Sequence, residues 1–249
     1  MLHDAAAAIS LFTRIPAWKI VKIDKENYDN AVTFWPFAGW VTGGVTALCI
    51  WLLSYVLPAV VAVIIAVAVR LLLTCGLHED GLADFCDGFG GGYDKEKILT
   101  IMKDSHIGTY GTLGLIMYSL LLVGLLSSLS PIVASLAILA ADPFSKLCAG
   151  QLTNILPYAR PEGAKNKLTY RRMSLSRILV MVTVGIIPSI PLVMEKTEYA
   201  FAFLLPVVML VLLSAYMRRK IGGYTGDCCG AAFLLCEVSM LVGVVVVGC

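Results

Sequence analysis

The sequence predicts an all-α fold, a polytopic transmembrane helical bundle of about seven spans that forms one domain over residues 1–249. Charged residues make up only 14% of the chain and hydrophobic residues 59%, whereas a soluble domain carries roughly 25% charged residues. The mean hydropathy of +0.85 agrees with a surface that largely faces lipid. Because a transmembrane helix needs about 20 apolar residues, the spans consume most of the 249 residues and leave no separate soluble domain.

Seven apolar runs are long enough to cross a bilayer. They lie at about 33–57, 58–75, 108–128, 131–155, 176–194, 199–217 and 228–248. Pro58 separates the first run from the second, and Pro131 separates the third from the fourth. Since proline interrupts a helix, each pair is expected to form a tight hairpin. A shorter apolar stretch at 5–12 predicts an interfacial helix that ends near Pro16.

Positive charge is concentrated at one end of the predicted spans. Of the 19 Lys and Arg residues, four precede the first run, three follow the second, six follow the fourth and three follow the sixth. Only Lys196 lies at the other end, while Arg70 and Lys146 lie within the runs. Because loops rich in these residues stay in the cytoplasm, we expect a cytoplasmic N-terminus and an external Cys249. The polar loops then face the cytoplasm.

The remaining composition excludes several classes of site. The 8 cysteines lie mostly inside apolar runs and form no C-x-x-C pair, a pattern that opposes a disulfide framework or a zinc site. The net charge of +2 gives no indication of nucleic-acid binding. We expect the lipid bilayer and small molecules as partners, and a homo-oligomer is compatible with the sequence.

An acidic segment connects the second run to the third. Asp80, Asp84 and Asp87 are spaced i, i+4 and i+7, so they share one face if the second helix continues this far. Three like charges on one stripe call for a cation, and Mg²⁺ prefers carboxylate and phosphate oxygens. Gly81 and Gly88 leave room for a bulky phosphate. The alternative is a solvated acidic loop.

A short amphipathic helix is expected at 95–103, directly after the acidic segment. Lys103 at its end is suited to meet a phosphate, and Asp104 is suited to complete a metal shell or to accept a proton from an attacking hydroxyl. His106 follows in the same loop, and His78 precedes the acidic run. For each histidine a structural role and a catalytic role are both open.

A second polar cluster lies where the sixth run ends, at 218–227. Three cations, ending at Lys220, precede a glycine-rich turn that contains Gly223, Thr225 and Asp227. Such a turn offers backbone N–H groups and positive charge to an anion. The cations alone are also what a cytoplasmic helix end requires. If both polar segments form one site, the end of the second helix must lie against the end of the sixth.

Four ionisable residues lie within the apolar runs, where such residues are candidates for function. Asp142 and Lys146 are spaced i, i+4 and are expected to pair, while Arg70 and Glu237 lie at similar depth in other runs. A structural ion pair and a functional role are both open for Asp142 and Lys146.

Several segments together carry a family resemblance. The most specific motif is H-x-D-G-L-A-D-x-x-D-G at 78–88, and G-G-Y-T-G-D at 222–227 is the second, with Glu237 ten residues further on. Shorter matching segments lie at 10–16, 101–105 and 158–160. With these motifs, which span almost the whole chain, the sequence resembles the cobalamin synthase family of adenosylcobinamide-GDP ribazoletransferases.

The resemblance implies the reaction and its site. A ribose hydroxyl of α-ribazole, or of its 5′-phosphate, would attack the corrin-side phosphorus of adenosylcobinamide-GDP and expel GMP, with Mg²⁺ as cofactor, at the cytoplasmic face of a prokaryotic inner membrane. The predicted metal ligands are Asp80, Asp84, Asp87 and Glu79; the predicted catalytic residues are Asp104 and His78; and the predicted substrate-binding residues are Lys103, Arg160, Lys220, Gly223, Thr225 and Asp227.

The chain departs from the family pattern at three places. Glu79 stands where the family has an apolar residue and adds a carboxylate that is suited to bind metal. Leu234 stands at a position that is commonly acidic, and Ser145 is followed by Lys146 where the family has arginine.

Three other functions fit parts of the sequence. Membrane prenyltransferases also carry Asp-rich cytoplasmic loops, and the core motif of CDP-alcohol phosphotransferases is echoed by Asp80–Ala83, although Asp84 stands in place of its arginine. An ion-coupled transporter would use Asp142, Lys146 and Glu237 as relays. The densest polar signal lies in loops instead of at the membrane midplane, which favours the enzyme.

Overall fold

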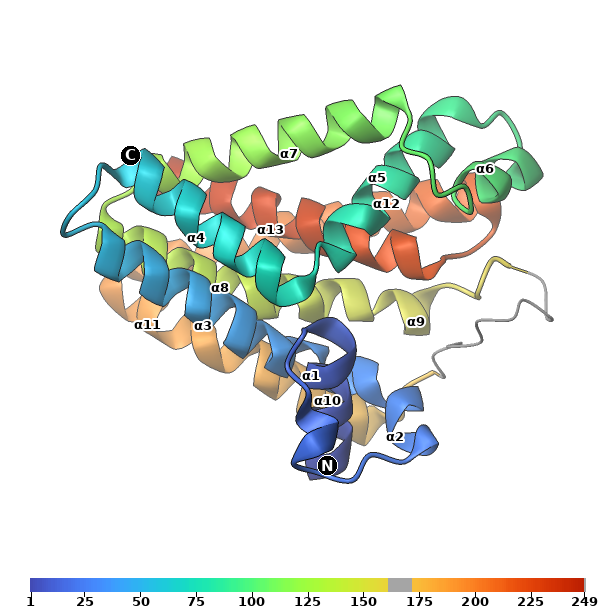
Figure 1. Cartoon of the computed structure of the whole chain (residues 1–249), viewed down its shortest axis with the longest axis horizontal. Helices are drawn as coiled ribbons and strands as arrows, with labels where there is room; N and C mark the ends of the chain where they lie inside the picture. The colour runs from blue at the N-terminus through green and yellow to red at the C-terminus, as the bar shows by residue number, and fades with distance from the viewer. Residues whose placement is uncertain (161–171, 249) are drawn as a thin grey trace.

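The structure is a computed structural model that describes residues 1–160 and 172–248. Three of the cations used to predict the orientation in the membrane lie outside the described residues: Lys165, Lys167 and Arg171. The α-helices are α1 (Leu2–Phe12), α2 (Lys25–Asp29), α3 (Trp35–Leu53), α4 (Ala59–Thr74), α5 (Leu77–Gly91), α6 (Lys95–Ile101), α7 (Thr109–Ser128), α8 (Pro131–Gly150), α9 (Leu152–Ile155), α10 (Leu175–Ile186), α11 (Ile190–Glu195), α12 (Leu204–Ile221) and α13 (Gly226–Gly248). Short 3₁₀ turns are η1 (Ala17–Lys19), η2 (Ala31–Phe34), η3 (Ile187–Ser189) and η4 (Thr197–Phe203). The long helices run side by side (Figure 1).

The predicted membrane bundle is confirmed. Within residues 1–160 and 172–248, six helices or joined helices are long and apolar enough to cross a bilayer, and the bent α4–α5 pair brings the number to seven if it counts as one span. The two hairpins form at Pro58 and Pro131, and the predicted helices at 5–12 and 95–103 appear as α1 and α6. No β-strand is present in the described part of the chain.

The acidic segment does not continue α4, so the condition under which it would extend the second helix is not met. Cys75 and Gly76 both have left-handed backbone (φ 59° and 65°), so they end α4 and start α5 in a new direction, 91° away. The physical reason is that four carboxylates on α5 would each carry a desolvation cost inside the apolar layer. We therefore treat α4 as the membrane helix and α5 as lying outside the spans.

Glycines bring α3 close to α8. A Cβ at Gly39 would lie 2.8 Å from the Cα of Pro143, and a Cβ at Gly43 would lie 3.1 Å from the carbonyl oxygen of Ile138. Such spacing of small residues, four apart, lets two helix backbones approach in a membrane, where packing replaces the hydrophobic effect as the cause of association. The G-x-x-x-G pattern of α3 thus fixes α8 at the centre of the bundle.

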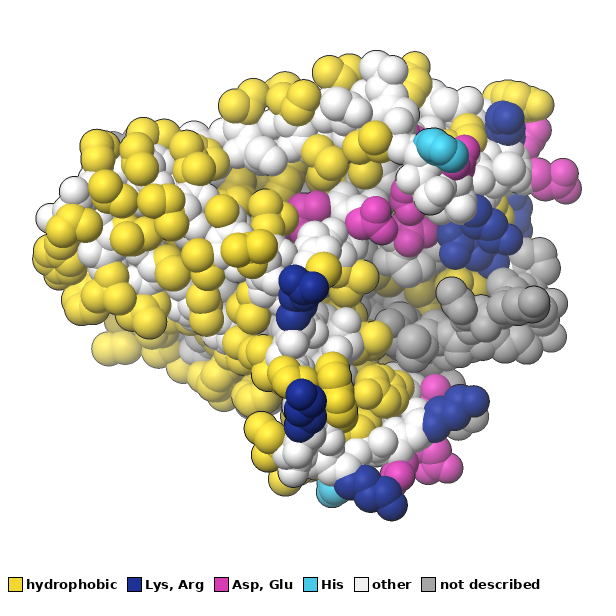
Figure 2. All heavy atoms as spheres, in the orientation of Figure 1, with side chains coloured by type: hydrophobic (Ala, Val, Ile, Leu, Met, Phe, Trp, Pro, Cys, Tyr) yellow, Lys and Arg dark blue, Asp and Glu magenta, His cyan; other side chains and the backbone are white. Residues whose placement is uncertain are grey.

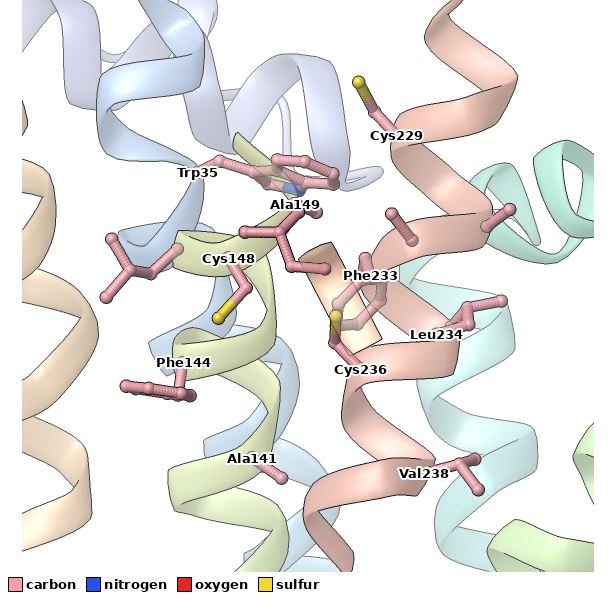
Figure 3. Packing of buried hydrophobic residues seen from close by; sticks show 14 of the residues in the cluster. Trp35, Ala141, Phe144, Cys148, Ala149, Cys229, Phe233, Leu234, Cys236 and Val238 are labelled. Atoms are coloured by element: carbon pink, nitrogen blue, oxygen red, sulfur yellow. The ribbon is translucent and has the colours of Figure 1, made fainter. Parts of the chain in front are cut away.

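Buried apolar residues pack between α8 and α13. Figure 3 shows Cys148 and Ala149 of α8 beside Phe233 and Cys236 of α13, with Trp35 of α3 at one end of the cluster. All five side chains are buried. Because α13 also packs along α5, this core holds the helices that support the polar end of the bundle.

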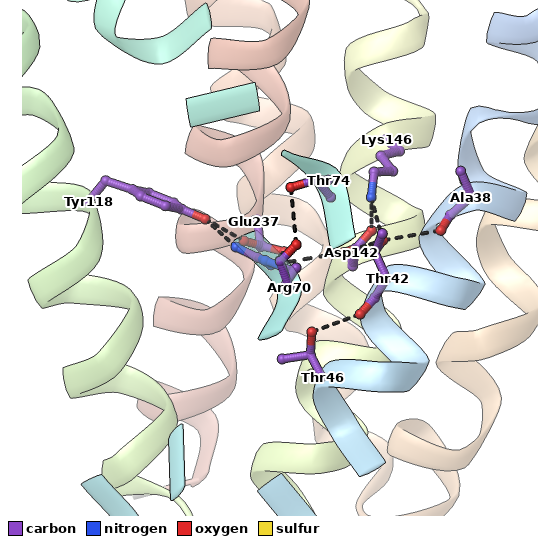
Figure 4. A network of polar contacts seen from close by, with 9 residues as sticks. All are labelled: Ala38, Thr42, Thr46, Arg70, Thr74, Tyr118, Asp142, Lys146 and Glu237. Atoms are coloured by element: carbon purple, nitrogen blue, oxygen red, sulfur yellow. Dashed lines mark hydrogen bonds and ion pairs between the residues drawn. The ribbon is translucent and has the colours of Figure 1, made fainter. Parts of the chain in front are cut away.

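A buried ionic network crosses the bundle near its middle (Figure 4). Arg70 of α4 pairs with Glu237 of α13 at 2.7 Å, and it donates a hydrogen bond to the hydroxyl oxygen of Tyr118 of α7 at 2.6 Å. The hydroxyl of Tyr118 in turn donates to the other oxygen of Glu237 at 2.9 Å. These three side chains close a triangle between α4, α7 and α13.

A second ion pair joins this triangle. The expected pair between Asp142 and Lys146 of α8 forms, and both residues also hydrogen bond to Thr42 of α3, at 2.8 Å and 2.7 Å. Asp142 lies 3.9 Å from Arg70, which links the two pairs, and the Lys146 ammonium lies 4.4 Å from the centre of the Phe233 ring. Two cations and two carboxylates are thus enclosed together, with no net charge.

Candidate active site

The two polar segments predicted to form one site lie against each other. A Cβ at Gly81 of α5 would lie 3.0 Å from the carbonyl oxygen of Asp227, and a Cβ at Gly230 of α13 would lie 3.2 Å from that of His78. Glycines at these positions therefore allow the backbones of α5 and α13 to touch. The contact lies at Gly81, whereas Gly88 packs against Met102. The predicted juxtaposition is present, at the beginning of the acidic segment.

A cavity of about 690 Å³ opens beside this contact. Its charged lining residues are Glu79, Asp80 and Asp84 of α5 and Arg14, which follows α1. Figure 2 shows acidic side chains gathered in the middle of this face, between an apolar surface and a group of cations. We call this space the acidic cavity. Three carboxylates and one guanidinium give it an excess of negative charge.

The carboxylates of the acidic cavity repel one another. Burial, together with the nearby carboxylates of Asp227 and Asp80, raises the pKa of Asp84 to about 7. A carboxyl group whose charge is this unfavourable gains stability from a cation. One oxygen of Glu79, Oε2, is also buried and has no hydrogen-bond partner among the described residues. Among the described residues, the positive charge beside α5 is therefore too small to balance these carboxylates.

The predicted Mg²⁺ ligands suit a site that is completed by water and substrate, and not a site made of protein side chains alone. Among the described residues, no three Asp, Glu, His or Cys side chains are arranged to hold a metal ion by themselves. Mg²⁺, however, is commonly held by one or two carboxylates together with water and substrate phosphate oxygens. Asp80 and Asp84 line the same cavity and suit this second manner of binding.

Asp87 has a different position from the other predicted metal ligands. Its two carboxylate oxygens accept the backbone N–H groups of Gly108 at 2.7 Å and Gly111 at 2.8 Å, at the start of α7. Free N–H groups at a helix start are stabilised by such acceptors. Asp87 therefore joins α5 to α7, and it does not line the acidic cavity.

The second cluster presents an ion pair. Arg160 donates to Asp227 at 2.9 Å, and the Thr225 hydroxyl donates to the same carboxylate oxygen at 3.3 Å. The turn is held by backbone hydrogen bonds to the segment at 157–159, and a Cβ at Gly223 would lie 2.2 Å from the carbonyl oxygen of Pro157. The predicted residues Arg160, Gly223, Thr225 and Asp227 are thus brought together.

The loop after α6 forms another wall of the acidic cavity. Ser105 and Ile107 line it, while Lys103 and Asp104 are exposed. Asp104 accepts a hydrogen bond from the ring of His106 at 2.6 Å, and this bond lowers the pKa of the carboxyl group.

Of the twelve predicted site residues, only Glu79, Asp80 and Asp84 line the acidic cavity; Lys220 and His78 are among the other nine. Lys220 is half-exposed in the last turn of α12 and does not line it. His78 is buried in an aromatic stack, where its ring centre lies 5.6 Å from that of Trp35 and 4.8 Å from that of Phe233. Burial, with the positive charges of Lys146 and Arg70, lowers the pKa of His78 well below its ordinary value. The imidazole is therefore neutral.

Arg14 lines the acidic cavity but was not among the site residues predicted from the sequence. It belongs to the family-matching segment at 10–16, and the positive-inside rule alone explains a cation there. In the structure its backbone N–H donates to Leu73 at 2.8 Å, which fixes the chain after α1 beside the end of α4. A guanidinium that faces three carboxylates across a cavity is well placed for a diphosphate.

Comparisons with known proteins agree over nearly the full chain. A family described as cobalamin-5-phosphate synthase matches residues 4–245. Proteins named adenosylcobinamide-GDP ribazoletransferase from Shewanella sp. (strain W3-18-1) and Shewanella oneidensis are 38% identical over 246 residues and 37% identical over 245 residues. Both alignments cover 97% of this chain and 93% of the relative. No solved structure matches the chain.

Proposed function

The chain belongs to the cobalamin-5-phosphate synthase family, and from this membership we propose that it is an adenosylcobinamide-GDP ribazoletransferase. The observation that carries the proposal is that the two motifs, 78–88 and 222–227, pack backbone against backbone at Gly81 and Asp227, and that the first motif also lines a cavity with carboxylates and a guanidinium. A membrane bundle with its carboxylates at one polar end suits a diphosphate substrate that arrives from water.

The proposed reaction exchanges one phosphate ester bond for another. A ribose hydroxyl of α-ribazole, or of its 5′-phosphate, forms a bond to the corrin-side phosphorus of adenosylcobinamide-GDP. The bond from that phosphorus to the bridging oxygen breaks, and GMP leaves with the electron pair. The hydroxyl proton passes to a carboxylate, for which we propose Asp104, because its loop forms a wall of the acidic cavity and its charge is held by His106.

We propose that Asp80 and Asp84 hold the cation, with Glu79 as a further oxygen donor. When bound, Mg²⁺ would neutralise the diphosphate and stabilise the charge of the leaving group. Asp87 secures the start of α7 against α5 and so keeps the neighbouring carboxylates in position.

The cations bind the phosphates and orient them in this proposal. On one side are Arg14, which follows α1, and Lys103, which lies in the loop after α6. On the other side is Arg160, which belongs to the second cluster with Thr225 and Asp227. A diphosphate in the acidic cavity would then be bounded by positive charge on two sides. His78 supports α5 from behind through its aromatic contacts.

The distribution of cations supports a cytoplasmic active site in the cytoplasmic membrane. Sixteen of the 19 Lys and Arg residues belong to the loops on the side of the acidic cavity, and such loops stay in the cytoplasm. A reporter enzyme inserted at Lys165 should read as cytoplasmic, and one fused after α13 should read as external. The reverse pattern would place the cavity on the wrong side for cytoplasmic substrates.

One assay tests the reaction directly. Purified protein in liposomes, supplied with adenosylcobinamide-GDP, α-ribazole and Mg²⁺, should release one GMP for each cobalamin formed. Omitting α-ribazole should abolish GMP release, and chelation of the metal should abolish both products until Mg²⁺ is restored. GMP release that does not depend on α-ribazole would indicate a hydrolase and contradict the proposal.

A further inference from the structure

A second, smaller cavity adjoins the acidic cavity. It has a volume of about 200 Å³, and Asp80 lines both spaces. Its other walls come from α1, α3, the start of α5 and the first turn of α13, with Phe12, Trp35 and His78 as aromatic members. We call it the aromatic pocket. Among the described residues, its only charged lining members are Asp80 and Asp227.

The aromatic walls are pre-arranged as a stack. The ring centres of Phe12 and Trp35 lie 4.9 Å apart, those of Trp35 and His78 lie 5.6 Å apart, and both pairs are nearly parallel, with interplanar angles of 20°. Because the rings pack on one another, a planar base would lie against the outside of the stack and not between two rings. Contact of a base with an aromatic ring contributes about 1–3 kcal/mol. The three rings are buried in the protein, so they keep their orientation before any ligand enters.

The size of the pocket selects among planar groups. An apolar cavity of about 150 Å³ is sufficient for benzene, so about 200 Å³ accommodates a fused two-ring base. A corrin ring is far larger and is excluded. The aromatic pocket therefore suits the benzimidazole base of an α-ribazole and not the corrinoid substrate.

The connection between the two cavities gives the ribose its place. Asp80 lies at their boundary, and Asp227 lines the aromatic pocket while it pairs with Arg160. With the base in the aromatic pocket, against the stacked rings, the sugar of the same nucleoside lies beside these two carboxylates. Its hydroxyl groups then face the acidic cavity, where the proposed function places the diphosphate.

We infer that the aromatic pocket is the subsite for the base of the acceptor nucleoside, so that Phe12, Trp35 and Gly226 determine which base the enzyme accepts. The inference rests on the proposed function. It adds a division of the site, in which the nucleoside base and the GDP-activated corrinoid occupy separate cavities that meet at Asp80.

Gly226 offers a specific test because it lines the aromatic pocket and a Cβ built there meets no atom within 4 Å. Gly226→Leu should fill part of the pocket without a clash, and leucine is the better helix former. We expect the KM for α-ribazole to rise tenfold or more while the KM for adenosylcobinamide-GDP changes less than twofold. The KM for a riboside with a single-ring base should rise less than the KM for α-ribazole.

Gly124→Leu is the matched control. Gly124 lies in α7, a Cβ there also meets no atom within 4 Å, and it lines neither cavity. This variant should leave both KM values at their wild-type levels. An equal rise in the KM for α-ribazole in Gly124→Leu would show that added bulk in a helix, and not a filled pocket, causes the effect.

Inhibition by free benzimidazole tests the inference in the unaltered protein. It should compete with α-ribazole and should not compete with adenosylcobinamide-GDP. If it competes with neither, or if folded Gly226→Leu keeps its KM for α-ribazole while the wild type releases GMP, the pocket assignment is wrong and the proposed function stands. If the wild type releases no GMP under any of these conditions, the proposed function fails and the assignment fails with it.

Discussion

The buried ionic network and the acidic cavity both collect charged side chains from several helices, but they treat that charge in opposite ways. In the network, Arg70, Asp142, Lys146 and Glu237 are no more than 2% exposed, and each has an oppositely charged partner. In the acidic cavity, three carboxylates face one guanidinium and open space. Among the described residues, each charge of the first region has its partner, whereas the second region has more carboxylates than cations.

This difference separates structural from chemical ionisable residues. A buried ion pair keeps several helices in register when each partner satisfies the other, as Arg70 and Glu237 do between α4 and α13. For this reason we propose a chemical role for the carboxylates of α5 that line the acidic cavity and a structural role for the charges at membrane depth. The same contrast explains why a transporter that uses Asp142 and Lys146 as relays is not the favoured function.

The largest expected effect comes from breaking the network. Arg70→Met leaves Glu237 buried without its cation, and removing one partner of a buried pair costs about 3–5 kcal/mol. We expect a matching loss in the free energy of unfolding, measured by denaturation in detergent micelles. The double variant Arg70→Met/Glu237→Met should recover much of this loss, because the uncompensated charge is gone.

Arg14→Met is the control, since Arg14 lines the open acidic cavity. It should lower the free energy of unfolding by less than about 1 kcal/mol, as expected for a cation in contact with solvent. Equal destabilisation by Arg70→Met and Arg14→Met would remove the distinction between a complete and an incomplete charge cluster.

Removing a carboxylate that lines the acidic cavity should have a comparably large effect on kcat but should not reduce stability. Asp80→Asn keeps the side-chain shape but removes a proposed metal ligand, and loss of such electrostatic stabilisation lowers kcat about 10²–10³-fold. The thermal unfolding midpoint should stay unchanged or rise, because a repulsive charge disappears. Steady-state GMP release and calorimetry measure the two quantities.

Asp87→Asn provides the contrast within the same helix. Because Asp87 accepts two N–H groups of α7, this change should reduce the free energy of unfolding by about 1–2 kcal/mol and should leave the Mg²⁺ concentration for half-maximal activity unchanged. Near-normal turnover of Asp80→Asn at saturating Mg²⁺ would remove Asp80 from the metal site, and a shifted Mg²⁺ requirement in Asp87→Asn would add Asp87 to it.

The smallest effect is expected from the second cluster. Thr225 donates to Asp227 and Lys220 precedes the turn, so both are proposed to contribute to substrate binding. Thr225→Ala and Lys220→Ala should each raise the KM for adenosylcobinamide-GDP about five- to tenfold, close to the net value of one typical hydrogen bond, with a smaller loss in kcat. An unchanged KM in both variants would leave the acidic cavity as the whole site for that substrate.

The sequence was sufficient to predict the spans and the meeting of the two motifs, because long apolar runs have few alternatives in a membrane. It did not show the break at Cys75 and Gly76, since cysteine seldom adopts left-handed backbone and gives no turn signal. Nor did spacing reveal that Asp87 binds the backbone of α7. That partner is set by tertiary packing, 21 and 24 residues further along the chain.

Within the buried network, the sequence predicted only the pairing of Asp142 with Lys146, because these residues lie one helical turn apart. The pairing of Arg70 with Glu237 joins residues 167 positions apart, and Tyr118 carried no signal at all. A hydroxyl in the middle of an apolar run looks like any other span residue until a neighbouring helix brings a charge to it.

The contact of α5 with α13 also has a consequence for biosynthesis. Asp227 and Gly230 emerge from the ribosome about 150 residues after Gly81, so the carboxylates of α5 have no wall to pack against until the last helix inserts. Arg70 likewise waits for Glu237 while the intervening spans enter the bilayer. The order of synthesis thus makes insertion of the final helix the step that both pairs the buried Arg70 and completes the proposed active site, so we expect an interrupted chain to be inactive as well as unstable.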